Sequence, residues 1–173
     1  MLISGYKLRE ALRNKRTLRD VLATRFNETL WQFIGDPSET VNNRPQETAD
    51  AFQEADQAVA MLEASQQFYN QQILVTISKQ KMTLARAIKL VGGAGRLEKM
   101  WRSAATDTGR DRYSHRETTR KSDDVQATRM VSADDSIRLA QKAAGYASSL
   151  RSAIAEANAR EIEIADVSPD LIT

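Results

Sequence analysis

Apolar residues recur every three or four positions along most of this chain, which is the spacing of amphipathic helices. Over residues 6–34 charged residues separate the recurring apolar positions. Ser4 stands where a capping side chain is expected, and Gly35 followed by Asp36 and Pro37 ends the pattern. We therefore predict a first helix over 6–34. Its apolar positions are Leu8, Leu12, Leu18, Leu22, Phe26, Leu30 and Phe33.

A heptad pattern marks the second helix, which we predict over 48–72. Its apolar positions advance in alternating steps of three and four, so they form one seam along the helix, with the polar Gln66 set into it. The polar connector before it holds Pro37 and Pro45, which are loop signals. Two helices joined by such a loop form a long antiparallel hairpin. The seam consists of Phe52, Ala55, Val59, Leu62, Gln66, Tyr69 and Ile73.

Two stretches change to a β-prone pattern. Residues 73–77 are apolar and β-branched, and residues 78–81 follow as a turn. Residues 125–131 alternate, with Val125 and Val131 on the same side. We expect these two strands to pair as a small two-stranded patch that leans on the helices, because a lone pair of strands is marginal in water.

Two further helices complete the expected fold. Thr83 caps a helix over 83–105, which we expect to kink at the glycine cluster 92–95. Ser132 and the acidic residues after it cap a last helix over 134–164. A basic loop, 106–124, separates these helices, and 165–173 form a tail. The sequence thus predicts one mainly α domain over 1–173, built as an oligomeric helical bundle.

Composition narrows the class of protein. The 173 residues include no cysteine, which excludes disulfides and thiolate metal sites and fits a reducing compartment. Charges begin at Lys7, so a signal-peptide core is lacking, and no run reaches the roughly 20 apolar residues needed to span a bilayer. We expect a cytoplasmic protein without cofactors. Alanine-rich and heptad faces exceed what one small core buries, which favours a homo-oligomer.

The net charge of +2 conceals a strong asymmetry. Residues 79–121 hold twelve basic against four acidic groups, a net charge of +8, while 1–78 carry −2 and 122–173 carry −4. A positive segment between acidic ones either pairs with them, within or between subunits, or faces an anion. Salt bridging on a solvated face is the simpler interpretation.

The glycine cluster is the first candidate site. Gly92, Gly93 and Gly95 lie within four positions, and glycine destabilises a helix interior by roughly 1 kcal/mol. One hypothesis is a nest of backbone N–H groups at the start of a second helix, which would hold a phosphate beside nearby cations. The alternative is a tight crossing of two helices. Neither a P-loop nor the dinucleotide fingerprint is present. The cations are Arg96, Lys99 and Arg102.

The basic loop is the second candidate site. Tyr113 lies among arginines, a combination suited to stacking on a base and holding a phosphate. The alternative is a solvated, charged loop. His115, the only histidine, lacks neighbouring metal ligands and does not by itself make a catalytic triad. The candidate residues of this loop are Arg110, Arg112, Tyr113, His115 and Arg116.

The order of short motifs resembles a known family. A first long helix, a polar loop and a second helix lead to Asn70, a short strand and a turn. After these come a helix that begins T-L-x-x-A-I, an R-Y-S motif, a second strand, an acid-capped helix and a closing I-x-E-x-N motif. The first motif is formed by Thr83, Leu84, Ala87 and Ile88, the second by Arg112, Tyr113 and Ser114, and the last by Ile154, Glu156 and Asn158. Taken together, this resembles the small bacterial and phage family known as septicolysin, which is functionally uncharacterised. The resemblance implies an oligomeric helical protein and supplies no catalytic residues.

Three functions remain open from the sequence. The first is a non-enzymatic oligomer that sequesters a small anionic ligand of nucleotide type in pockets lined by residues 92–116, with phage proteins that sequester host defence signals as the analogy. The second is a structural or scaffolding oligomer whose basic stretch docks on acidic neighbours. The third, nucleic-acid binding, is disfavoured by the acidic flanks. No acid–base pair or nucleophile marks an enzyme.

Overall fold

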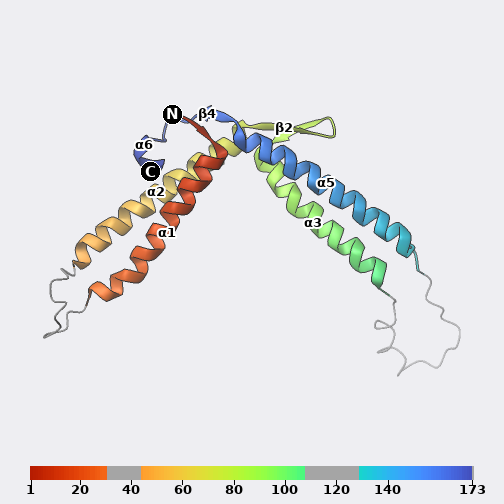
Figure 1. Cartoon of the computed structure of the whole chain (residues 1–173), viewed down its shortest axis with the longest axis horizontal. Helices are drawn as coiled ribbons and strands as arrows, with labels where there is room; N and C mark the ends of the chain where they lie inside the picture. The colour runs from red at the N-terminus through yellow and green to blue at the C-terminus, as the bar shows by residue number, and fades with distance from the viewer. Residues whose placement is uncertain (31–43, 108–128, 173) are drawn as a thin grey trace, which may run out of the picture.

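Two helical hairpins diverge from a common apex (Figure 1). A computed structural model describes residues 1–30, 44–107 and 129–172. The first arm pairs α1 (Gly5–Thr29) with α2 (Pro45–Gln72), and the second arm pairs α3 (Leu84–Thr106) with α5 (Ala133–Ala159). The prediction of a mainly helical chain with an antiparallel hairpin is confirmed, and the two further helices form a second hairpin.

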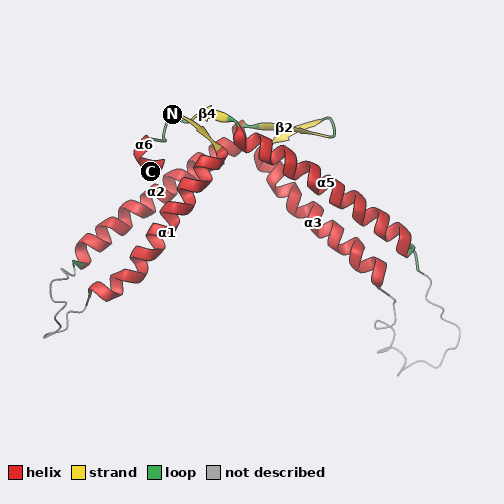
Figure 2. Cartoon of the chain, in the orientation of Figure 1, coloured by secondary structure: helices red, strands yellow, loops and turns green. Residues whose placement is uncertain are grey.

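The described residues form four short strands, which lie at the apex above the helices (Figure 2). The strand β1 (Leu2–Ser4) pairs with β4 (Glu161–Glu163), and β2 (Leu74–Ile77) pairs with β3 (Gln80–Thr83), both antiparallel. A single helical turn, α6 (Pro169–Ile172), follows β4. The β1–β4 pair brings the first residues of the chain beside residues 161–163.

Helix α1 begins where the sequence predicts. The Ser4 hydroxyl accepts a hydrogen bond from the Lys7 amide at 3.4 Å, which satisfies one of the free N–H groups of the first turn. The described helix ends at Thr29, short of the predicted end at 34, and residues 31–34 lie outside the described residues.

Opposite charge joins the two helices of the first arm. Helix α1 carries seven basic and three acidic residues, whereas α2 carries five acidic and no basic ones. Arg16 pairs with Glu63 and Arg19 with Asp56 across the interface. These pairs lie at the solvent-accessible surface, so they contribute little to stability and mainly fix which helices meet.

The heptad seam of α2 is confirmed as the buried side of the first arm. Ala55, Val59, Leu62 and Tyr69 are buried, while Phe52 at the outer end of the seam is 36% exposed. The helix begins at Pro45, three residues before the predicted start. Proline at the first helical position has a fixed φ that suits a helix and lacks an N–H that would be unpaired there, so this residue starts α2 rather than belonging to the connector.

The strand that pairs with β2 is not the predicted one. Residues 80–83, expected as part of a turn and the start of a helix, form β3, and the hairpin turns at Ser78 and Lys79. Both have positive φ, 50° and 67°, as the tight two-residue hairpin turn requires. The predicted partner was 125–131. Residues 129–131 are not a strand, and 125–128 lie outside the described residues.

Helix α3 runs without a break through the glycine cluster. Thr83 caps it as predicted, accepting from the Arg86 amide. Because 92–95 are helical, their amide groups belong to the helix ladder and do not form an anion-binding nest, so that hypothesis is wrong. Among the described residues no helix crosses closely at Gly93 or Gly95, since a Cβ built on either glycine meets nothing within 4 Å.

Helix α5 is capped as predicted but ends earlier. The Ser132 hydroxyl accepts from the Asp135 amide at 3.0 Å, and Asp134 and Asp135 lie in the first turn. The helix stops at Ala159 instead of 164, because the chain turns into β4 and pairs with β1. Its alanine stripe packs against α3.

The best-packed core lies at the apex. Ile3, Leu8, Leu62, Tyr69, Leu84 and Leu150 are fully buried there, where all four long helices approach one another. The arms beyond the apex are two helices thick, and large apolar side chains stay exposed along them. Examples are Leu18, Val21, Met61, Phe68, Leu97, Met100, Ile137 and Tyr146. No helix in the described ranges is long and apolar enough to cross a membrane.

Candidate binding site at the apex

The structure divides the sequence-predicted site residues into two groups. Arg110, Arg112, Tyr113, His115 and Arg116 lie outside the described residues. The other six lie along α3, and they are Gly92, Gly93, Gly95, Arg96, Lys99 and Arg102.

Of the cations on α3, the structure brings two to one place. Arg96 and Lys99 line an open hollow of about 520 Å³ near the outer end of the helix. Arg102 does not line it and pairs with Glu98 at 2.9 Å instead. The glycines do not contribute to this hollow.

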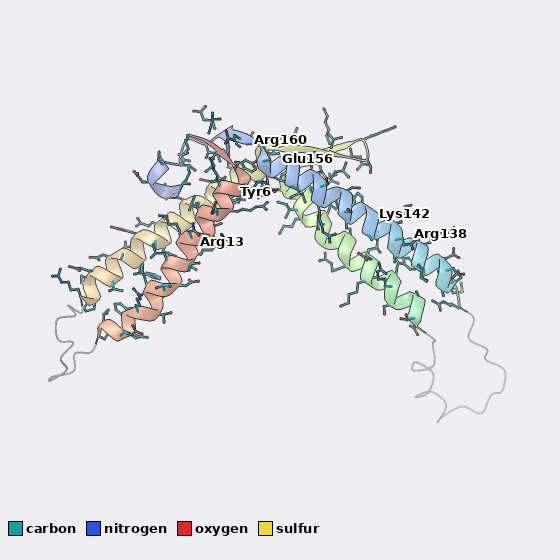
Figure 3. The ribbon with its side chains drawn as sticks, in the orientation of Figure 1. Tyr6, Arg13, Arg138, Lys142, Glu156 and Arg160 are labelled. Atoms are coloured by element: carbon teal, nitrogen blue, oxygen red, sulfur yellow. The ribbon has the colours of Figure 1, made fainter. Side chains whose placement is uncertain are left out.

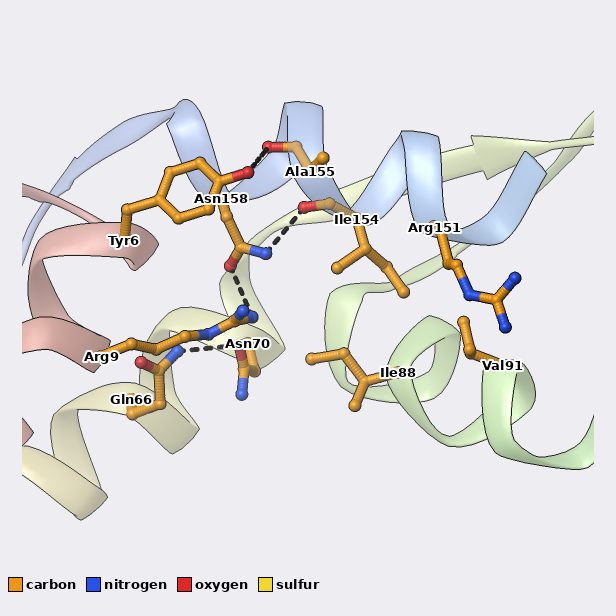
Figure 4. Close-up of a pocket in the computed structure, with 10 residues that line it drawn as sticks. All are labelled: Tyr6, Arg9, Gln66, Asn70, Ile88, Val91, Arg151, Ile154, Ala155 and Asn158. Atoms are coloured by element: carbon orange, nitrogen blue, oxygen red, sulfur yellow. Dashed lines mark hydrogen bonds between the residues drawn. The ribbon is translucent and has the colours of Figure 1, made fainter. Parts of the chain in front are cut away.

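A second pocket lies between the arms at the apex, and we call it the apex pocket (Figure 4). It has a volume of about 470 Å³ and takes its lining from all four long helices. Only the apex brings these helices together, so the pocket depends on the way the two arms are joined. Its lining residues are Tyr6, Arg9, Gln66, Asn70, Ile88, Val91, Arg151, Ile154, Ala155 and Asn158.

Hydrogen bonds between α1 and α5 set one wall of the apex pocket. The Tyr6 hydroxyl donates to the Ala155 carbonyl at 3.1 Å, and Arg9 Nη2 donates to Asn158 Oδ1 at 2.9 Å. Asn158 in turn donates from Nδ2 to the Ile154 carbonyl at 2.7 Å. Asn158 is only 1% exposed, so its amide is a fixed partner that holds the Arg9 guanidinium at the edge of the pocket.

The α2 wall contributes amide groups. Gln66 Nε2 donates to Asn70 Oδ1 at 3.1 Å. Within the described part of the chain, Gln66 Oε1 is buried without a hydrogen-bond partner. A buried acceptor left in this way destabilises a protein by roughly 1–3 kcal/mol, and a donor on a bound molecule would relieve it.

The charged residues that line the apex pocket are all basic. Arg9 comes from the first arm and Arg151 from the second, and no residue of the lining is acidic. Arg151 forms no ion pair with any described residue. Ile88, Val91 and Ile154 form an apolar wall beside Arg151 (Figure 4).

Behind the pocket, three helices meet at a very short distance. A Cβ on Gly5 would lie 2.6 Å from Asn158 Oδ1 and 2.7 Å from Tyr69 Cε1, so only glycine fits there. The Tyr69 hydroxyl lies 2.7 Å from the carbonyl oxygens of both Ala157 and Arg160. Burial raises the pKa of Tyr69, because the phenolate would lose its hydration.

Sequence reasoning missed this site, although part of its signal was visible. Gln66 breaks the apolar seam of α2, and Asn158 stands four residues after Ile154 on the buried stripe of α5. Polar side chains on buried faces need partners, so they mark where helices exchange hydrogen bonds. Arg9 and Arg151 carried no such signal, because they resemble any other exposed cation on a helix.

No family model, curated protein or solved structure matches this chain, so the resemblance to the septicolysin family stays a prediction. In the described part of the chain there is no cluster of three or more histidines or carboxylates that could hold a metal ion.

Proposed function

We propose that this protein is a non-enzymatic binding protein that holds a small anion of nucleotide type in the apex pocket. The observation that carries the proposal is the lining itself, in which two arginines from different arms face a space without any acidic residue. A guanidinium binds phosphate or carboxylate through paired N–H donors, so two of them at one pocket favour an anion.

The remaining lining fits the rest of such a ligand. Asn70 and Gln66 offer amide donors and acceptors for the polar edge of a base or sugar. Ile88, Val91 and Ile154 offer an apolar surface for a ring. A volume of about 470 Å³ is within the range of roughly 300–1,000 Å³ that small-molecule pockets occupy.

Binding without turnover suits the chemistry of the lining. None of its members is a carboxylate, histidine, serine or threonine. Its one hydroxyl, that of Tyr6, donates to the Ala155 carbonyl, so the lining offers no paired acid and base. A protein that sequesters a nucleotide signal must bind the nucleotide without chemically altering it. The role of a phage anti-defence protein is an analogy that extends the proposal, and the ligand panel below addresses it directly.

Calorimetry on the full chain tests the proposal, with cyclic dinucleotides and ADP-ribose as ligands. Arg151→Ala should weaken the binding of the best ligand roughly 10- to 100-fold, the loss expected for a charged hydrogen bond. Lys142→Ala is the matched control, because Lys142 is exposed on the same helix farther from the apex (Figure 3). Absence of binding by every member of the panel, or equal binding by the two variants, would contradict the proposal.

A scaffolding oligomer is the second candidate function, and one observation favours it. The arms leave large apolar side chains exposed along their outer length, which two-helix arms do not cover by themselves. Light scattering together with the calorimetry separates the two candidates, since a pure scaffold would assemble and bind no member of the ligand panel.

A further inference from the structure

A second regular row of residues runs along α2, apart from the buried seam. Its members advance in alternating steps of three and four, so they lie on one face, and every one of them is exposed. Met61 is 47% and Phe68 is 45% exposed, which is unusual for side chains of this size on a helix of a folded chain. We call this set the acidic row, and it consists of Glu47, Asp50, Glu54, Gln57, Met61, Ala64 and Phe68.

A similar row runs along α3. It also advances in alternating steps of four and three, and Leu97 and Met100 on it are 46% and 67% exposed. Gly93 lies in its middle with open space where a side chain would stand. We call this set the basic row, and it consists of Arg86, Leu90, Gly93, Leu97, Met100 and Ala104.

The two rows belong to helices of opposite charge. All five charged residues of α2 are acidic, and α3 carries five basic residues against Glu98 alone. Asp56 and Glu63 of α2 pair with α1. Glu54 on the acidic row and Arg86 on the basic row form no ion pair with any described residue. Both rows therefore carry a charge that is unpaired among the described residues of one copy.

We propose that the acidic row of one copy packs against the basic row of a second copy, with α2 and α3 parallel. Each row is charged towards its N-terminal end and apolar towards its C-terminal end. Only a parallel arrangement brings the charged ends together and the apolar ends together, because an antiparallel one would place Asp50 against Met100.

One register of this packing matches residue sizes as well as charges. With Asp50 beside Arg86, Ala64 lies beside Met100 and Phe68 beside Ala104, so at both places a large side chain meets a small one. Met61 and Leu97 form an apolar pair between them, and Glu54 falls beside Leu90. In the same register Gln57 falls beside Gly93. A closely packed neighbour would explain a glycine in a helix interior that no contact among the described residues requires.

The proposed contact joins two different surfaces, so it is heterologous and propagates from copy to copy into a ring or a filament. It leaves the apex pocket open. Asn70 is two residues beyond Phe68, and Ile88 lies two residues from both Arg86 and Leu90, so Asn70 and Ile88 lie roughly 200° around their helices from the rows. Val91, the residue after Leu90, is turned roughly 100° from it. Assembly and ligand binding are therefore separable, and this inference does not depend on the proposed function.

Disulfide trapping tests the contact cleanly, because the chain has no cysteine. Met61→Cys and Leu97→Cys proteins, mixed and oxidised, should give a covalent dimer that neither variant gives alone. The matched control is Gln67→Cys mixed with Leu97→Cys, since Gln67 is exposed on another side of α2. Equal cross-linking by Gln67→Cys, or cross-linking of Met61→Cys to itself, would overturn the proposed packing.

Charge reversal provides the second test. Asp50→Arg and Arg86→Asp should each reduce the oligomer measured by size-exclusion chromatography with light scattering, and the double variant should restore it. Both residues are exposed, so circular dichroism should show unchanged helicity in every variant. A wild-type chain that stays monomeric at the highest soluble concentration, or a double variant no better than the singles, would overturn the inference.

Discussion

Gly5→Ala should destabilise the protein, although alanine is the better helix former. The added Cβ would lie 2.6 Å from Asn158 Oδ1 and 2.7 Å from Tyr69 Cε1, closer than atoms at a Cβ normally approach. Both neighbours are almost completely buried, with exposed fractions of 1% and 0%, so neither side chain can swing aside into solvent. The substitution must therefore move a helix or disturb the contacts between the arms.

The magnitude follows from three contributions. Overpacking a well-packed site destabilises by roughly 1–3 kcal/mol. Displacement of the Tyr69 ring weakens a buried hydrogen bond to the Ala157 or Arg160 carbonyl, worth about 1 kcal/mol. Helix propensity returns at most about 1 kcal/mol. The free energy of unfolding should thus fall by about 1–3 kcal/mol, which corresponds to a fall in Tm of roughly 5 °C for a chain of this size.

Urea unfolding followed by far-ultraviolet circular dichroism measures this difference. Gly145→Ala is the matched control, because Gly145 is an exposed position inside α5 where a Cβ meets nothing within 4 Å. There the same substitution should stabilise by up to about 1 kcal/mol. The opposite signs of the two changes are the expected result. If Gly5→Ala proves as stable as wild type, the close approach at the apex does not exist as described.

Two further predictions concern single side chains. Burial raises the pKa of Tyr69 above its ordinary value of 10.0, so the unfolded chain loses this proton before the folded chain does. The free energy of unfolding should therefore fall as pH rises above 10, and it should fall less steeply in Tyr69→Phe. Urea unfolding at a series of alkaline pH values measures both slopes, and identical slopes would refute the assignment. Arg129 donates hydrogen bonds to carbonyls at the end of α3, including those of Ala104 and Asp107. Arg129→Ala should therefore destabilise the protein by about 1 kcal/mol and accelerate amide hydrogen exchange in the last turn of α3. The control Arg138→Ala removes only an exposed ion pair and should leave the exchange in α3 unchanged.

The sequence predicted those parts of the fold that depend on neighbours in the chain. Ser4, Thr83 and Ser132 each cap the helix that follows, because a cap needs only a hydroxyl beside the first free amides. The seam of α2 was also predictable, since the period of apolar residues identifies the buried face whatever packs on it.

The pairing of the strands could not be predicted from the sequence. The strands β1 and β4 are three residues each and lie at opposite ends of the sequence, too short to show an alternating pattern. The partner of β2 was missed because Ser78 and Lys79 replace the Asn-Gly or Asp-Gly pair that usually marks a tight hairpin turn. The β1–β4 pair therefore depends on a contact between distant residues, whereas the local β2–β3 hairpin depends on turn residues that give no recognised signal.

The candidate site also combines features that the sequence predicted with features that it did not. The sequence identified the cationic character of α3 and offered an anion nest as one hypothesis for its glycines, but a continuous helix has no free amides there. The apex pocket draws on all four long helices, so no local motif describes it. Polar residues on the buried stripes, Gln66 and Asn158, were the available clue.

The pairing of β1 with β4 has a consequence for the order in which the molecule folds. Each arm is a hairpin of neighbouring helices with low contact order, whereas joining residues 2–4 to 161–163 closes nearly the whole chain. We expect the hairpins to form early and the apex to close last. Substitutions at the apex, such as Gly5→Ala, should then leave the refolding rate almost unchanged and accelerate unfolding instead.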